Sequence, residues 1–113
     1  MKKVYVSGAI SAETLDEIDE NIEFARRHML ELWKIPNLGV FCPHTNDMGA
    51  HLGGAPYEQL MEFDFWMVKN CDAIYMLPNW EDSLGAKREL AYAQALGKRV
   101  LHSITEVKAW VKE

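Results

Sequence analysis

Short β-prone apolar runs alternate with helical segments along the whole chain, and this alternation limits the fold more than any other feature. Strands are predicted at 3–7, 39–42, 72–77 and 99–102, and helices at 11–35, 57–70, 83–96 and 105–113. Strands joined through helices form parallel sheets covered on both faces. The sequence therefore predicts a three-layer α/β fold: a flavodoxin/Rossmann-like parallel sheet of four to five strands with helices on both faces.

The length of 113 residues fits one domain, residues 1–113, without a linker or an internal repeat. Several helix boundaries carry local signals. Ser11 or Thr14 is a suitable cap for the first helix and Ser83 for the third, while Gly97 is the residue expected just after a helix end. On the third helix, Leu90, Ala93 and Leu96 are expected to pack inward. Residues 44–56, rich in Gly, Asn, Asp and His, show no apolar period and are predicted to form a long loop.

Charge and composition exclude several classes of protein. The formal charge of −5, with acids and bases interleaved, argues against binding of a nucleic acid polymer. No long apolar run and no charged leader with an apolar core is present, so we expect neither a membrane span nor export, and a cytoplasmic location. Cys42 and Cys71 lack any paired motif and are expected to be buried free thiols.

Ligands of such folds bind at the carboxyl ends of the strands, where the strand order reverses. Glu89 lies in the helix that follows the third strand and borders its apolar side. Asp64 shares a helical face with Met61 and Val68, and Tyr5 in the first strand is able to send its hydroxyl to a buried carboxylate. The alternatives are a surface Glu89 paired with Lys87 or Arg88, a solvated Asp64 and a Tyr5 that only fills the core.

Three further groups of residues lie at the same edge of the sheet. The hydroxyl of Ser83 and the amides behind it suit an anion, and Gly85 lets a ligand approach the backbone. Trp80 has two roles open to it, stacking on a base or packing. A metal site is conceivable in the long loop, but its spacing matches no standard ligand pattern. The candidate ligands are Cys42, His44, Asp47 and His51.

Taken in order, three motifs resemble the nucleoside 2-deoxyribosyltransferase superfamily over roughly residues 2–100. They are Val4-Tyr5-Val6-Ser7-Gly8-Ala9-Ile10, Asp64 with Cys71-Asp72-Ala73-Ile74, and Ser83-Leu84-Gly85 with Glu89-Leu90-Ala91-Tyr92-Ala93 and Leu96-Gly97-Lys98. The pattern from Trp80 to Glu89 is most similar to the DUF4406 branch. The Ser-Leu-Gly-x-x-x-Glu run also resembles 2′-deoxynucleoside 5′-phosphate N-hydrolases.

The resemblance implies a catalytic role for three residues. Glu89 would attack the anomeric carbon, Tyr5 would hold Glu89, and Asp64 would bind the base or help to protonate it. On chemical grounds, His44 is a second candidate for protonating the base. The resemblance implies substrate binding by Gly8, Ile10, Ser83 and Gly85, and the positions of Ser11, His44 and Trp80 make them further candidates for substrate contact. Ser11 stands where the nucleotide hydrolases carry a phosphate-binding Arg, and Asp82 resembles the acid that binds a 5′-hydroxyl in the nucleoside transferases.

The expected function is thus hydrolysis or transfer at the N-glycosidic bond of a (deoxy)nucleoside or its 5′-monophosphate. No metal or organic cofactor is expected, and the small molecule is the only ligand besides further copies of the chain in a homo-oligomer. The resemblance also implies a C-terminal segment reaching into a neighbouring subunit, and the sequence ends at Glu113 without it. Two alternatives stay open: a catalytically inactive nucleotide-binding sensor, and an interaction domain without a ligand.

Overall fold

The computed structural model describes residues 1–113 and contains one sheet of four parallel strands. The central strand β1 (Lys2–Ser7) lies between β2 (Leu38–Phe41) and β3 (Ala73–Met76), and β4 (Arg99–Leu101) pairs with β3. The order β2-β1-β3-β4 reverses direction at β1. The predicted α/β class with a parallel sheet is confirmed, with four strands.

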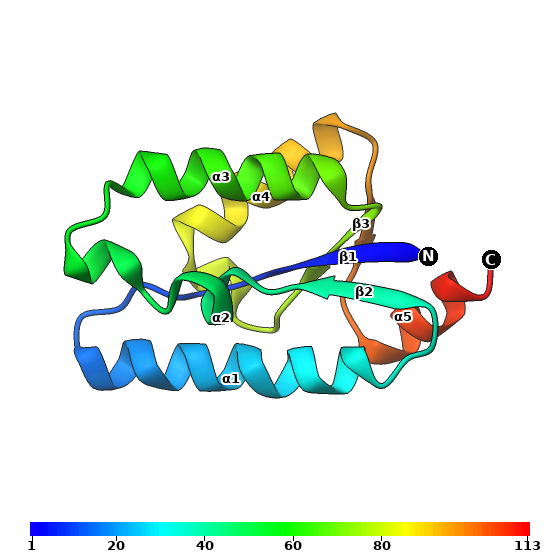
Figure 1. Cartoon of the computed structure of the whole chain (residues 1–113), viewed down its shortest axis with the longest axis horizontal. Coiled ribbons are helices and arrows are strands. Elements are labelled where there is room, and N and C mark those ends of the chain that lie inside the picture. Colours follow the sequence, from blue (N-terminus) through cyan, green and yellow to red (C-terminus); the bar gives the residue numbers. More distant parts are fainter.

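Helices cover both faces of the sheet (Figure 1). On one face, α1 (Leu15–Trp33) and α5 (Ile104–Val111) bury their apolar sides in a core with the inner residues of β1 and β3. On the other face, α3 (Tyr57–Asn70) and α4 (Leu84–Ala95) enclose a smaller core. None of these helices combines the length and the apolar character that crossing a bilayer requires.

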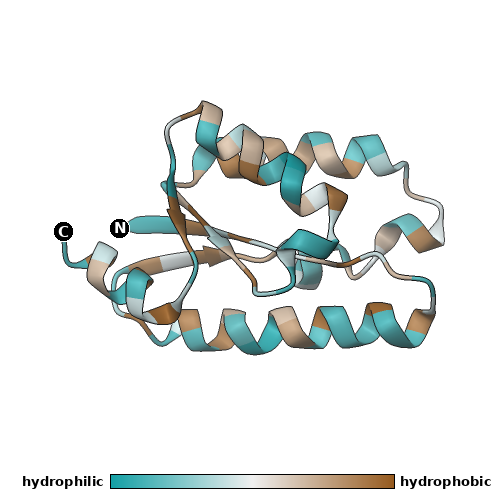
Figure 2. Cartoon of the chain, turned by 180° about the vertical axis from the view of Figure 1, so that it is seen from behind, coloured by the Kyte–Doolittle hydropathy of each residue, from teal (hydrophilic) through white to brown (hydrophobic).

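The alternation of side chains in β1 assigns its residues to the two cores. Val4 and Val6 are buried on the α1 and α5 side, whereas Tyr5 is buried on the α3 and α4 side. Ser7, two residues after Tyr5, therefore faces the same way as Tyr5. The hydropathy colouring in Figure 2 shows the strands largely apolar and the helices alternating between polar and apolar stretches.

Local capping signals account for most helix starts. The Thr14 hydroxyl accepts a hydrogen bond from the Glu17 amide, so Thr14 rather than Ser11 caps α1. Ser83 caps α4 in the same way through the Ala86 amide. Gly97 follows α4 with a φ of 71°, as expected after a helix end. Leu96 was expected to pack inward, but it is 42% exposed because the helix ends there.

The prediction of a long loop over 44–56 is wrong. A short helix α2 (Pro43–Asp47) and a 3-10 turn η1 (Ala50–Gly53) occupy this region. Each ends in a left-handed residue, Met48 and Gly54, which turns the chain sharply. Helices of four or five residues show no apolar period, and α2 is held by packing against α1 instead. A second 3-10 turn, η2 (Trp80–Asp82), precedes α4.

Candidate active site

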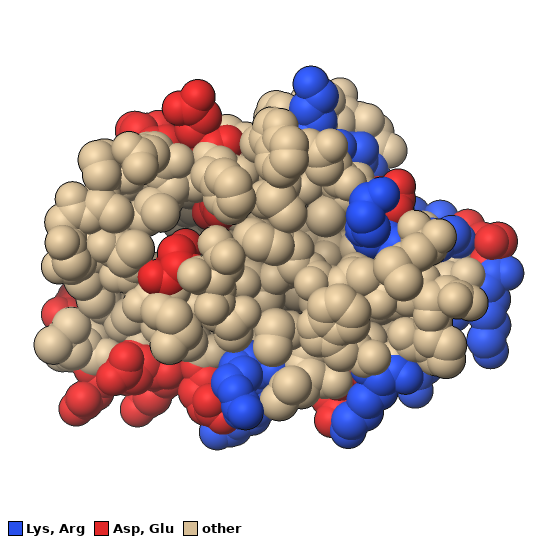
Figure 3. All heavy atoms as spheres, viewed as in Figure 1, with Lys and Arg blue, Asp and Glu red and all other residues tan.

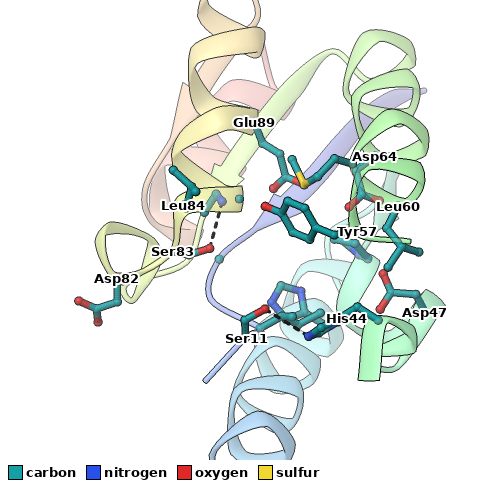
Figure 4. Close-up of a pocket in the computed structure, with 17 residues that line it drawn as sticks. Ser11, His44, Asp47, Tyr57, Leu60, Asp64, Asp82, Ser83, Leu84 and Glu89 are labelled. Carbon is teal, nitrogen blue, oxygen red and sulfur yellow. Dashed lines mark hydrogen bonds between the residues drawn. The ribbon is translucent and has the colours of Figure 1, made fainter. Parts of the chain in front are cut away.

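A cavity of about 360 Å³ opens at the carboxyl ends of β1 and β3, where the strand order reverses. Segments from the whole chain meet there: the loop after β1, α2, η1, α3 and the start of α4. Figure 4 shows the side chains that line it. The 17 lining residues are Gly8, Ile10, Ser11, Pro43, His44, Asp47, His51, Tyr57, Leu60, Met61, Asp64, Asp82, Ser83, Leu84, Gly85, Ala86 and Glu89.

Glu89 is a buried carboxylate held by two hydroxyl groups. Its side chain is 5% exposed and lies on the buried face of α4 with Ala86 and Ala93. The Tyr5 hydroxyl donates to Oε2 at 2.6 Å, as expected from the sequence, and the Ser7 hydroxyl donates to Oε1 at 2.6 Å. Burial of a carboxylate is costly without such partners, so this pair of donors fixes both the position and the orientation of Glu89.

The pKa of Glu89 reflects two opposing effects. Burial raises it to about 7, while the hydrogen bonds from Ser7 and Tyr5 favour the ionised form and limit the rise. The pKa of Tyr5 is itself raised, by burial and then by the charge of Glu89, so its phenol keeps its proton and acts as a donor. Near neutral pH, Glu89 is therefore ionised in a substantial fraction of molecules.

Asp64 is the second carboxyl group of the cavity. It lies on the buried face of α3 with Met61 and Val68, as the helical spacing predicts, and is 8% exposed. Burial, and then the charge of Glu89, raise the pKa of Asp64 to about 8. The charge of Glu89 disfavours ionisation of Asp64, whereas hydrogen bonding with Asp64 favours ionised Glu89, so the two titrate as a pair and the last proton resides mainly on Asp64. One acid and one carboxylate then coexist at neutral pH.

The backbone of the loop after β1 is held from two sides at Ala9. The Ala9 amide donates to Oδ1 of Asn79 at 3.1 Å, and its carbonyl lies 3.0 Å from Nε2 of His44. Because a carbonyl only accepts, Nε2 of His44 carries the proton. His44 is 1% exposed, and burial lowers its pKa. This neutral imidazole has its only N–H engaged, so it positions the loop and has no proton available for a substrate.

The start of α4 forms the wall opposite α2. Ser83 and Gly85 both line the cavity, as the sequence predicts. The first-turn amides of a helix have no partners within the helix and suit a polar substrate group. A Cβ on Gly85 would lie 3.3 Å from the Tyr57 hydroxyl, so the glycine permits close packing of α3 against this helix start. Asp82 also borders the cavity, and its carboxylate points away from the other side chains in Figure 4.

At the rim, the Ser11 hydroxyl lies 3.3 Å from Nε2 of His51, which links the loop after β1 to η1. Gly8 and Ile10 line the cavity beside Ser11. The expected binding residues of the first loop are therefore brought together with those of α4.

Trp80 departs from the expectation of substrate contact. It does not line the cavity but packs, half-buried, against the core that contains Tyr5, with its ring 6.5 Å from that of His102. The reason is local: η2 turns the chain after β3, and the indole folds back onto the sheet. Packing, the second role considered for Trp80, is the one found.

The sequence interpretation missed Ser7, which contacts Glu89, and Tyr57, which lines the cavity, although both carried a usable signal. Ser7 follows Tyr5 by two positions on a strand, so it shares the Tyr5 face. Tyr57 precedes Met61 by four and Asp64 by seven residues, which is the spacing of one helical face. Asp47 was considered only as a metal ligand. No group of three or more His, Cys, Asp or Glu side chains is arranged to hold a metal ion.

Comparison with known proteins places the fold. The solved structures that match include a 2-deoxyribosyltransferase from Leishmania mexicana (TM-score 0.64, 23% identity), a 2-deoxyribosyltransferase from Bacillus psychrosaccharolyticus (0.58, 22%) and the CMP N-glycosidase BcmB from Clostridium botulinum (0.56, 20%). In the same order, the matched regions cover 90%, 87% and 88% of this chain, and 63%, 69% and 66% of the three other chains. The chain thus covers less than two thirds of the Leishmania protein.

Comparison with the curated proteins gives no match. The model of DUF4406, described as a domain of unknown function, matches residues 2–102. This range includes all four strands, the cavity and the Tyr5, Asp64 and Glu89 side chains. The chain therefore belongs to the DUF4406 family, with the fold of the nucleoside 2-deoxyribosyltransferases.

Proposed function

We propose that this protein breaks the N-glycosidic bond of a nucleoside or nucleotide, with Glu89 as the nucleophile. The observation that carries the proposal is the buried carboxylate of Glu89, held by the Tyr5 and Ser7 hydroxyls and exposed only toward a cavity that it shares with Asp64. A structural role would not require a charge at this depth.

The reaction uses the two carboxyl groups in different protonation states. Ionised Glu89 attacks the anomeric carbon and forms a glycosyl ester, while Asp64, which keeps its proton to higher pH, donates to the departing base. Water then releases the sugar in a hydrolase, or a second base takes it in a transferase. Both outcomes retain the configuration of the anomeric carbon, because two displacements occur.

The similar structures support the same class of reaction. By their names, two transfer deoxyribosyl groups and the third is a CMP N-glycosidase, so all three act on a sugar–base bond. At 20–23% identity the likeness concerns the fold. The assignment of chemistry to this chain therefore depends on its own Glu89, Asp64 and Tyr5.

Release of free base tests the proposal directly. We expect the protein to release base from at least one member of a panel of nucleosides and 5′-monophosphates, measured by chromatography, and Glu89→Gln to slow release at least roughly a thousandfold. Glu20→Gln is the matched control, because Glu20 is exposed on α1 and does not line the cavity. Addition of a second free base distinguishes transfer from hydrolysis.

One result would contradict the proposal and favour the alternative function. If the panel binds by calorimetry and no base is released from any compound, the protein is a nucleotide-binding sensor that keeps the pocket without the reaction. A mass increase on Glu89 with a 2′-fluorinated nucleoside, whose glycosyl ester hydrolyses slowly, would in turn identify the nucleophile.

We also propose that the protein self-associates through the outer face of α3. Phe63 and Trp66 are 47% and 58% exposed there, and their rings stack with centroids 6.3 Å apart. Exposed aromatic pairs are typical of protein interfaces. Glu62 and Lys69 are exposed on either side of them, so two copies of α3 in antiparallel contact would place each Glu62 near the partner's Lys69.

A further inference from the structure

The charge of the cavity is unbalanced. Four of its lining residues are acidic, and none is Lys or Arg. None of the four acids takes part in a salt bridge. Arg88, the cation adjacent in sequence to Glu89, is directed to the outer surface, where it binds Glu58 at 3.0 and 3.1 Å. In Figure 3 the hollow contains acidic atoms and no basic ones.

Two of the acids lie on the α2 and α3 side of the cavity, facing the start of α4 (Figure 4). Asp64 is nearly buried and points into the cavity without an ion-pair partner. Asp47, at the end of α2, accepts only the Gly49 amide at 2.9 Å. Burial is the main cause of the shifted pKa values of Asp64, Glu89 and His44, and the charge of Asp47 adds a smaller upward effect on each, so its field extends across the cavity. A bound positive charge would relieve this repulsion.

An aromatic ring completes the same region. Tyr57 lines the cavity and is 40% exposed. The face of a phenol ring attracts cations, and this ring already lies 5.9 Å from the guanidinium of Arg88. Carboxylates together with an aromatic ring are the groups that recognise a flat cationic heterocycle. A phosphate dianion would find no Lys or Arg in the lining, only the amides at the start of α4 and the Ser11, Ser83 and His51 side chains beside four acids.

We propose that the cavity selects its N-glycoside by charge, taking nucleosides with a cationic base in preference to neutral nucleosides, and both in preference to 5′-monophosphates. This inference rests on the function proposed above. A cationic base departs without help from an acid: the C1′–N bond breaks, its electron pair neutralises the base, and the Glu89 carboxylate forms the C1′–O bond. Water then attacks the ester, which yields the sugar, free Glu89 and one proton.

The test compares 7-methylguanosine, guanosine and guanosine 5′-monophosphate, each with ribose and with 2′-deoxyribose, at slightly acidic pH where the methylated base is cationic. Each kcat/KM is divided by the rate of spontaneous hydrolysis, because a cationic base is also the better leaving group in water. The expected order is cationic, neutral, monophosphate. Asp47→Asn should lower the cationic-to-neutral ratio roughly tenfold, because one charge is removed from a poorly solvated site. Glu20→Gln should leave the ratio unchanged, because Glu20 is exposed on α1 outside the cavity.

The outcomes separate this inference from the proposed function. If base is released in a Glu89-dependent manner but neutral nucleosides or monophosphates are preferred, charge selection is wrong and the function stands. If no compound releases base, the proposed function is wrong. Charge selection is then tested by calorimetry, which gives the dissociation constants of the same three compounds for the wild type and for Asp47→Asn. Equal affinities, or an unchanged ratio in Asp47→Asn, would overturn it.

Discussion

The hydrogen bonds that the Tyr5 and Ser7 hydroxyls donate to Glu89 lead to a testable prediction about the pKa of Glu89. Ser7 and Tyr5 stabilise the ionised carboxylate, so Ser7→Ala or Tyr5→Phe should raise the pKa of Glu89 further, by roughly one unit each. Activity at neutral pH should fall and partly recover at higher pH. The pH dependence of kcat/KM measures this shift of the acidic limb. A uniform loss of activity at all pH values would mean that the hydroxyls do not act through ionisation of Glu89.

The pair of carboxyls also predicts the wild-type pH profile. Activity requires ionised Glu89, whose pKa is about 7, and protonated Asp64, whose pKa is about 8. The rate with a neutral nucleoside should therefore be bell-shaped, with its maximum between these values. Asp64→Asn should abolish the alkaline limb. A profile that rises steadily with pH would show that Asp64 is not the proton donor.

At the scale of elements, the turn after β1 depends on close packing at Gly8. A Cβ there would lie 2.5 Å from Cδ1 of Leu77 and 2.9 Å from Oδ1 of Asn79, which holds the Ala9 amide. Gly8→Ala should therefore displace the loop, lower the melting temperature by several degrees through a cost of roughly 1–3 kcal/mol, and reduce substrate binding. Gly53→Ala is the control, because nothing lies within 4 Å of its added Cβ. Equal melting temperatures of Gly8→Ala and Gly53→Ala would contradict the argument that close packing at Gly8 excludes a Cβ.

The helices and strands also show how much of the structure could be predicted from the sequence. Strand and long-helix positions follow from local periodicity and caps, as at Thr14 and Ser83, and these anchor the cavity. The α2 helix could not be predicted because it is too short for a period and is stabilised by packing against α1. The role of Trp80 could not be predicted either, because tertiary contacts alone determine whether an aromatic residue beside a site stacks on a ligand or packs against the core. Asp64 and Glu89 could be predicted as site residues from the sequence, because each is a carboxyl group on an otherwise apolar helical face.

For the molecule as a whole, buried carboxyls determine how stability depends on pH. In the folded state, Glu89 and Asp64 have pKa values near 7 and 8, above the ordinary carboxyl range near 4. The folded protein therefore binds more protons than the unfolded chain between about pH 4 and 8, so these groups make stability fall as pH rises through that window. Glu89→Gln should raise the melting temperature at pH 8 and change it little at pH 4. The opposite trend in calorimetry would refute the assigned direction.

The proposed self-association concerns the molecule as a whole. Because the aromatic pair of Phe63 and Trp66 is exposed on α3, Trp66→Glu should convert a dimer to monomers in sedimentation experiments. The control is Leu96→Glu, which adds the same charge at a 42% exposed apolar residue just past the end of α4.

The charges beside the aromatic pair test the antiparallel arrangement itself. Glu62→Lys places two lysines in each contact and should weaken the dimer, and adding Lys69→Glu should restore it, because the opposite charges then face one another again. Rescue by the double variant is not expected from a loss of folding or from a dimer formed through another surface. A wild type that stays monomeric at high concentration, or a double variant weaker than either single one, would exclude this face as the contact.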